Sequence, residues 1–125
     1  MWKGREIKVV FAEEAEQQYQ ELKKAIEEEI KQGIASSEHQ TLFRSIDRAT
    51  TLLKGDPFIG IQIPKRNFAR KYITKYGATN QWKFDLSNFW RMIYTVKNEE
   101  LTIIGFILDI IDHNTYNKLF GYRKK

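Results

Sequence analysis

Four side chains in the second half of the sequence are suited to chemistry on a phosphate group: Lys83, Arg91, His113 and Tyr116. Arg91 stands among bulky, largely apolar neighbours. A guanidinium in such a setting either reaches solvent or meets an anion, because burying it unpaired is costly. It can bind a phosphate through two parallel hydrogen bonds and stabilise charge that develops there. The alternative is a structural ion pair with Asp85 across a β-hairpin.

His113 follows an apolar run that ends at Ile111, where the last strand is expected to stop. Histidine titrates near neutral pH and can pass protons to or from a reacting oxygen. The alternative is a capping or surface histidine. Tyr116 falls on the same side if this segment is helical, and it can stack on a base or share the proton transfer. Its alternative is a half-buried tyrosine that packs on the sheet.

Lys83 lies between Trp82 and Phe84, so strand alternation points it away from both aromatic side chains. If the two aromatic residues face helices, Lys83 faces the opposite side with any bound phosphate. Basic residues just upstream are candidates for phosphate contacts, which supply affinity without selecting a sequence. They are Lys65, Arg66, Arg70 and Lys71. The alternative is a solvated basic surface without a ligand.

Composition narrows the classes of protein and of site. The 125 residues, 42% of them hydrophobic, predict a single domain over residues 1–125 with one core of its own. Lys and Arg number 21 against 16 Asp and Glu, and the net charge of +5 favours anionic partners such as nucleic acid. The absence of cysteine excludes disulfides, thiolate metal sites and cysteine nucleophiles.

We expect no metal, no cofactor and no membrane segment. Asp109, Asp112 and His113 would not converge well enough at a strand end to hold a metal ion. The longest uncharged apolar stretch, residues 101–108, is far shorter than the roughly 20 residues that span a bilayer. The N-terminus lacks the apolar core of a signal peptide. A cytoplasmic location is therefore expected.

The pattern of apolar residues predicts an α+β fold. A strand is expected over Glu6–Phe11, followed by an amphipathic helix over Glu13–Lys31 and a second helix from the cap at Ser37 to Leu53. After a basic helix or turn over Pro64–Tyr76 come three strands with hairpin-length connections. These strands are Gln81–Leu86, Trp90–Val96 and Leu101–Ile111, and a helix or turn over Asn114–Phe120 follows.

We expect the two long helices to form an antiparallel hairpin on one face of an antiparallel sheet, which the C-terminal three-strand meander completes. The other face is expected to stay open to solvent. Residues 1–53 have a net charge of −2 and residues 54–125 a net charge of +7, which favours a helical scaffold in front of a basic, strand-rich surface.

Three blocks of this sequence resemble the RelE/ParE family of bacterial and archaeal toxins, specifically its RelE-like branch. They are Trp82–Leu86, Phe89–Val96 and Asp109–Tyr116. The middle block is similar to the family's strand of pattern aromatic, Arg, two hydrophobic residues and Tyr, which carries an inward arginine. The order of elements also matches over nearly the whole chain.

The resemblance implies the toxin of a type II toxin–antitoxin system, an endoribonuclease that cleaves mRNA on the ribosome without a metal ion. It implies catalytic roles for Arg91, His113, Tyr116 and Lys83. It implies RNA binding by Lys65, Arg66, Arg70, Lys71, Tyr122 and Arg123. The partners it implies are mRNA, the ribosome and a cognate antitoxin. The alternatives are a ParE-like gyrase poison that acts by contact, and an inactive homologue that binds only antitoxin or RNA.

An antitoxin strand is expected to join an edge of the sheet. The unusually apolar last strand is expected to be central, which leaves the first strand and Gln81–Leu86 as the candidate edges.

Overall fold

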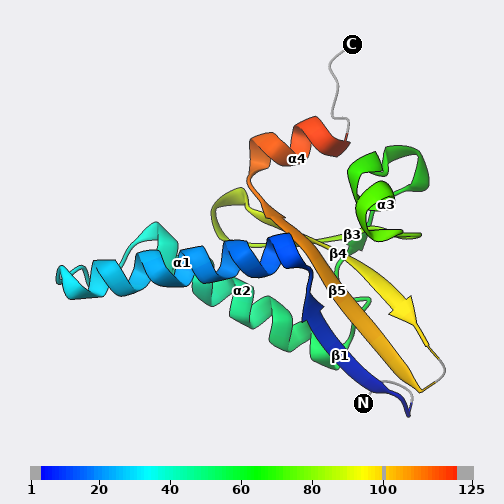
Figure 1. Ribbon diagram of the computed structural model, residues 1–125, viewed down its shortest axis with the longest axis horizontal. Helices are drawn as coiled ribbons and strands as arrows, with labels where there is room; N and C mark the ends of the chain where they lie inside the picture. Colours follow the sequence, from blue (N-terminus) through cyan, green and yellow to red (C-terminus); the bar gives the residue numbers. More distant parts are fainter. Residues whose placement is uncertain (1–3, 100, 121–125) are drawn as a thin grey trace.

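The described part of the chain has an α+β fold in which four α-helices pack on a five-stranded mixed sheet (Figure 1). The computed structural model describes residues 4–99 and 101–120. The strands lie in the order β1-β5-β4-β3-β2. In chain order the elements are β1 (Glu6–Phe11), α1 (Glu13–Lys31), α2 (Glu38–Gly55), β2 (Ile61–Gln62), the 3₁₀ segment η1 (Lys65–Asn67), α3 (Arg70–Tyr76), β3 (Trp82–Asp85), the 3₁₀ segment η2 (Ser87–Phe89), β4 (Arg91–Asn98), β5 (Thr102–Ile111) and α4 (His113–Phe120).

The sheet differs from the predicted antiparallel one because β1 pairs in parallel with β5. The meander β3-β4-β5 is antiparallel as predicted, since its short connections fix the strand directions. No hairpin constrains β1, because its partner β5 is far away in the sequence. The sequence therefore allowed β1 to run either parallel or antiparallel to β5. The central position predicted for the last strand is confirmed, because β5 lies between β1 and β4.

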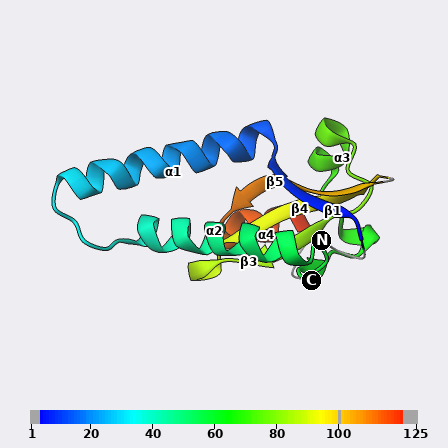
Figure 2. The ribbon, with the colours of Figure 1, turned by 90° about the horizontal axis from the view of Figure 1, so that it is seen from below.

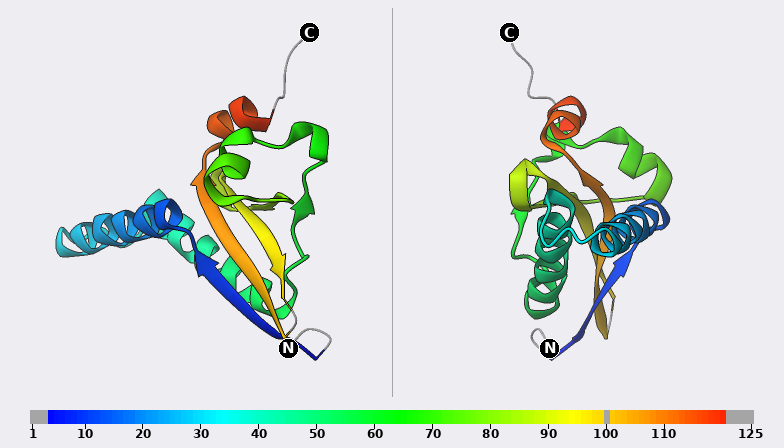
Figure 3. Two further views of the ribbon diagram at one scale, coloured as in Figure 1. Left: turned by 45° about the vertical axis from the view of Figure 1, so that its right-hand side comes forward. Right: turned by 90° about the vertical axis from the view of Figure 1, so that its left-hand side faces the viewer.

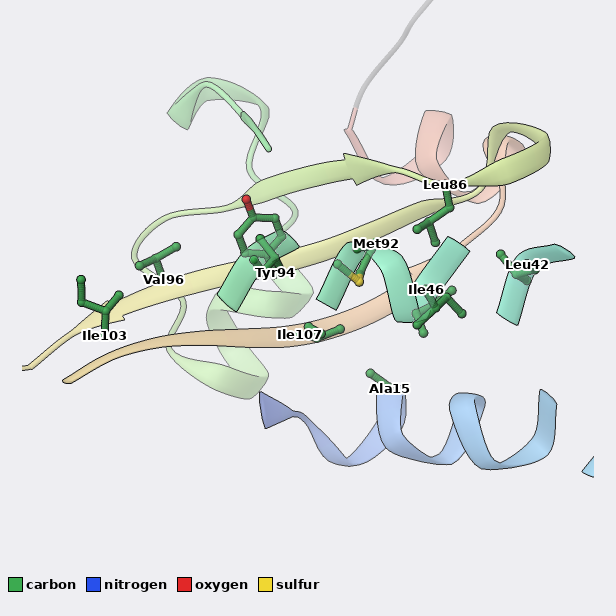
Figure 4. Packing of buried hydrophobic residues seen from close by; sticks show 12 residues of the cluster. Ala15, Leu42, Ile46, Leu86, Met92, Tyr94, Val96, Ile103 and Ile107 are labelled. Carbon is green, nitrogen blue, oxygen red and sulfur yellow. The ribbon is translucent and has the colours of Figure 1, made fainter. Parts of the chain in front are cut away.

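The predicted helical hairpin is confirmed, and it covers one face of the sheet (Figure 2). Ser37 caps α2, and its hydroxyl oxygen accepts a hydrogen bond from the Gln40 backbone N–H at 3.2 Å. Alternate residues of β4 point toward the helices and pack against Ile46 of α2 and Ile107 of β5 (Figure 4). Trp82 and Phe84 pack against the same core, so Lys83 points to the other face, as predicted.

The other face of the sheet is covered in part, which corrects the prediction, and its β1 side stays exposed, as at Val10. The helices α3 and α4 cover this face in part with a second hydrophobic core (Figure 3). Tyr72 of α3 and Phe120 of α4 meet Ile93 of β4 there, and all three side chains are fully buried or nearly so. The prediction gave no packing role to the helix or turn over Asn114–Phe120, but its aromatic residues Tyr116 and Phe120 are buried in this second core.

The strand β3 is not a free edge over its whole length, which corrects a second expectation. Its first half pairs with the two-residue strand β2, Ile61 opposite Lys83 and Gln62 opposite Trp82. Gly60 leads into β2 and lies so close to the sheet that an added Cβ would come within 2.5 Å of the Lys83 carbonyl oxygen. A glycine is therefore required for β2 to pair here.

Candidate functional site

Three charged side chains of β3 and β4 lie on the second face of the sheet, beside α4. The register pairs Lys83 with Ile93 and Asp85 with Arg91. Directly paired residues of antiparallel strands point to the same face, and Ile93 belongs to the core beneath α3 and α4. Lys83, Asp85 and Arg91 are therefore neighbours on one surface.

Lys83 and Arg91 both lie over the ring of Tyr116 from α4. The Arg91 Cζ atom is 5.2 Å from the ring centroid, and the Lys83 Nζ atom is 5.6 Å from it. The negative face of an aromatic ring attracts cations, which helps hold two like charges close together. Tyr116 is only 3% exposed, so its ring supports the cations from below and does not offer a free surface to a base.

Asp85 pairs with both cations. Its Oδ1 atom lies 2.9 Å from Lys83 Nζ and 3.1 Å from Arg91 Nε. The ion pair considered as the structural alternative for Arg91 is thus present, although the Nε–H group is not oriented to donate a hydrogen bond to it. One carboxylate faces two cations, so Lys83, Asp85 and Arg91 together have a net positive charge. The side chains of Lys83 and Arg91 are 14% and 12% exposed, which limits the screening of that charge.

His113 opens α4 at the same end of the sheet. Its exposed ring lies 5.9 Å from the ring of Phe89, and its Nε2 atom is 3.3 Å from Asn117 Nδ2. The Phe89 carbonyl oxygen in turn accepts a hydrogen bond of 2.7 Å from Arg91 Nη1. Phe89 therefore connects the two residues, and Lys83, Arg91, Tyr116 and His113 form one site, which we call the cation site.

The backbone of Asp112 and its carboxylate hold the start of α4. Asp112 Oδ1 accepts a hydrogen bond of 2.8 Å from the Thr115 backbone N–H, and the Asp112 carbonyl accepts one of 2.9 Å from the Tyr116 backbone N–H. The Thr115 hydrogen bonds lower the pKa of Asp112 from its ordinary value. The orientation of His113 and Tyr116 thus depends on this cap.

Phe89 is a site residue that sequence reasoning missed. It is 70% exposed, beside Arg91 and His113. It follows Asn88 in the tight turn between β3 and β4, and both residues have positive φ angles, 53° for Asn88 and 65° for Phe89. The sequence did contain a signal for this residue. A two-residue hairpin turn with two positive φ angles favours Asn followed by Gly, so a phenylalanine after Asn88 is unusual there.

The four basic residues predicted to bind RNA upstream of β3 do not lie on one surface. Lys65 and Arg66 are exposed on η1, next to a groove of about 210 Å³ that Pro64, Lys83 and Tyr116 help to line. They therefore extend the positive surface of the cation site. Arg70 is exposed on α3.

Lys71 lies elsewhere, in a polar pocket of about 540 Å³ between α1, α3 and the end of β5. Its Nζ atom is 3.5 Å from Asp109, a buried carboxylate that also accepts a hydrogen bond of 2.8 Å from the Tyr72 hydroxyl. Burial and this carboxylate raise the pKa of Tyr72. Gln18 completes the network by donating to Asp109 at 3.0 Å. The structure therefore engages Lys71 in a structural contact, whereas it was predicted as an RNA ligand.

Two predicted RNA-binding residues, Tyr122 and Arg123, lie outside the described residues. Within residues 4–99 and 101–120, no group of three or more His, Asp or Glu side chains is arranged to hold a metal ion. No helix in that part of the chain is both long and apolar enough to span a membrane.

Comparisons of this chain with protein-family models, with curated proteins and with solved structures find no match.

Proposed function

We propose that this protein is a metal-independent endoribonuclease that cleaves mRNA on the ribosome, as the toxin of a type II toxin–antitoxin system. The observation that carries the proposal is the convergence of Lys83 and Arg91 over the Tyr116 ring, beside the exposed His113. Such a surface suits the phosphodiester of RNA, which needs charge compensation at phosphorus and proton transfer at the neighbouring oxygens.

In the proposed reaction the nucleophile belongs to the RNA. The 2′-oxygen attacks the adjacent phosphorus, and the bond from phosphorus to the 5′-oxygen breaks, which leaves a 2′,3′-cyclic phosphate and a 5′-hydroxyl. His113 is the proposed proton carrier: its neutral imidazole takes the proton of the 2′-hydroxyl and then gives that proton to the departing 5′-oxygen. Arg91 and Lys83 stabilise the added negative charge on the phosphate oxygens.

The proposed partners follow from charge and from the edges of the sheet. An acidic antitoxin would cover the cation site and so exclude RNA. The outer side of β1 carries no paired strand among the described residues, whereas half of β3 is occupied by β2. A strand contributed by the antitoxin would therefore add at β1.

The test is primer-extension mapping of cleavage in a reconstituted translation reaction, repeated with the same message as naked RNA. We expect cleavage that depends on translating ribosomes. Arg91→Ala is expected to lower the rate by about 10²–10³-fold, as for loss of a transition-state donor. His113→Ala is expected to lower it by roughly 10²-fold or more, the contribution typical of general acid–base catalysis.

Lys97→Ala provides the matched control. Lys97 is a lysine on β4 that lies 5.0 Å over the ring of Phe106, at the other end of the strand from Arg91. We expect this variant to cleave like the wild type. An uncut message in the wild-type reaction would contradict the proposal, and inhibition of DNA gyrase by the same preparation would favour the contact-poison alternative.

A further inference from the structure

The turn between β3 and β4 places an exposed aromatic ring beside the cation site. Phe89 is 70% exposed, so its burial contributes little to the stability of the fold. The ring forms one wall of a surface pocket of about 440 Å³, whose other lining residues include Asp85, Asn88 and Arg91. That volume is in the range of pockets that hold small organic groups.

The backbone conformation of Phe89 is unfavourable for the residue that occupies it. Trp90 N–H closes the turn by donating to the Ser87 carbonyl at 3.1 Å, and both intervening residues have positive φ. Glycine adopts this conformation freely, whereas a bulky residue is strained there. Neither core packing nor turn geometry accounts for a phenylalanine here, and such a strained, exposed residue points to a contact made outside the fold.

We propose that Phe89 is the platform on which an unpaired nucleobase stacks next to the phosphate bound at the cation site. This inference rests on the proposed function and specifies the substrate as single-stranded RNA with at least one base turned out of its stack. The Phe89 carbonyl oxygen accepts a hydrogen bond from Arg91 Nη1 at 2.7 Å, so the turn that carries the ring also holds the proposed phosphate ligand. Aromatic rings bind every base by its π-face, and stacking therefore adds affinity with little choice of sequence.

His113 borders the same ring, with 5.9 Å between the centroids. A base on Phe89 would thus place its own nucleotide between Arg91 and His113, where the phosphate is to be cleaved. Bases inside a duplex already stack on their neighbours and cannot reach such a platform. Duplex RNA is therefore expected to bind only through its phosphates.

The experiment compares binding of a short, labelled oligouridine with binding of the same oligomer made of abasic nucleotides. Wild-type protein is expected to prefer oligouridine by about five- to one-hundredfold in Kd, the range typical of one stacked base. Phe89→Gly is expected to bind both oligomers equally, at the affinity that the wild type shows for the abasic one. Phe89→Trp, which keeps an aromatic face, is expected to retain the preference.

Two controls separate this inference from stability and from the proposed function. Phe89→Gly relieves the strained turn, so its Tm is expected to equal or exceed that of the wild type, and lost binding cannot then be ascribed to unfolding. Leu101→Gly, at a position 77% exposed at the other end of the sheet, is expected to bind like the wild type. Arg91→Ala is expected to weaken binding of both oligomers.

The possible results distinguish the two proposals. If Arg91→Ala weakens binding but Phe89→Gly does not, the stacking inference is wrong while the proposed function stands, and the ring is assigned to a protein contact. The stacking inference is also overturned if the wild type binds oligouridine and the abasic oligomer equally, or if it binds neither. If Phe89→Gly removes the preference for oligouridine but no message is cut, base stacking stands and the proposed cleavage is wrong.

Discussion

At the scale of single residues, the cation site depends on an imbalance of charge. Asp85 accepts contacts from both Lys83 and Arg91, and this carboxylate occupies part of the space that a phosphate would otherwise fill. Its side chain is 55% exposed, so it can move away when a stronger anion arrives. In the proposed function, Asp85 is therefore an internal counter-ion that would compete with an RNA phosphate for the two cations.

Replacing this carboxylate is expected to strengthen RNA binding. Asp85→Asn should lower the Kd for oligouridine by roughly fivefold, which corresponds to the ~1 kcal/mol between unit charges about 4 Å apart in water. The free energy of unfolding should change by less than about 1 kcal/mol, because the ion pairs are partly exposed. Fluorescence anisotropy and urea titration measure the two effects. Asp85→Glu keeps the charge and serves as control, and weaker binding by Asp85→Asn would contradict this role.

At the scale of elements, α4 carries two residues of the site and depends on the cap at Asp112. The Thr115 backbone N–H holds the pKa of the Asp112 carboxyl below its ordinary value of 3.8. A carboxyl group with a lowered pKa in the folded state stabilises the fold above its unfolded pKa, and this stabilisation is lost as the pH falls through the lower folded value. The contribution is therefore complete at neutral pH.

Removal of the Asp112 cap should therefore lower the free energy of unfolding at neutral pH and have less effect at low pH. Asp112→Ala is expected to reduce the free energy of unfolding by about 1 kcal/mol at pH 7, the usual cost of losing an N-cap. The difference from the wild type should shrink below about pH 4, where the wild-type carboxyl gains its proton. Urea denaturation along a pH series measures it. Asp112→Asn keeps a capping oxygen and is expected to fall between the two proteins at neutral pH.

The elements that local patterns determine were predicted well. β1 and α1 have the predicted bounds, and Ser37 caps α2 as its sequence indicated. The three strands of the meander were predicted because short turns specify which strands pair and alternation specifies which face each side chain is on. The same two features put Lys83 and Arg91 on one face of neighbouring strands. The features that were not predicted depend on tertiary contacts.

The pairing of β1 with β5 and the packing of α3 and α4 on the second face depend on residues far apart in sequence, which no local pattern encodes. The two-residue strand β2 is too short to have a period. Phe89 was missed because an aromatic residue near a strand resembles a core residue until its exposure is known. The contact of Lys71 with the buried Asp109 could not be predicted, because the two residues come from elements far apart in the sequence.

At the scale of the whole molecule, positive charge is unevenly distributed, and only part of it is available to RNA. Residues 54–125 have a net charge of +7, but Lys71 contacts Asp109 and Lys75 forms an ion pair of 2.7 Å with Glu14. Lys65 and Arg66, in contrast, are exposed beside the groove that reaches Lys83. We therefore expect the basic residues to contribute unequally to RNA binding.

The dependence of RNA affinity on salt tests this distribution. Each lost phosphate contact to a single strand reduces the slope of log K against log salt concentration by about 0.7. Lys65→Ala and Arg66→Ala should each show a reduction of that order, whereas Lys71→Ala should leave the slope unchanged. Titrations of oligouridine at several potassium chloride concentrations measure the slopes. A reduced slope for Lys71→Ala would place RNA over the pocket at Asp109.

The parallel pairing of β1 with β5 has a consequence for the order in which a newly made chain acquires its structure. The strand β1 has no partner until residues 102–107 have been synthesised, since among the described residues it pairs with those alone. Contacts between distant parts of a chain form slowly, because a long loop must close first. The helical hairpin can assemble early, but sheet closure and the docking of α4 come last. A chain that stops before residue 102 would therefore carry an unpaired β1 and would lack His113 and Tyr116 of the cation site.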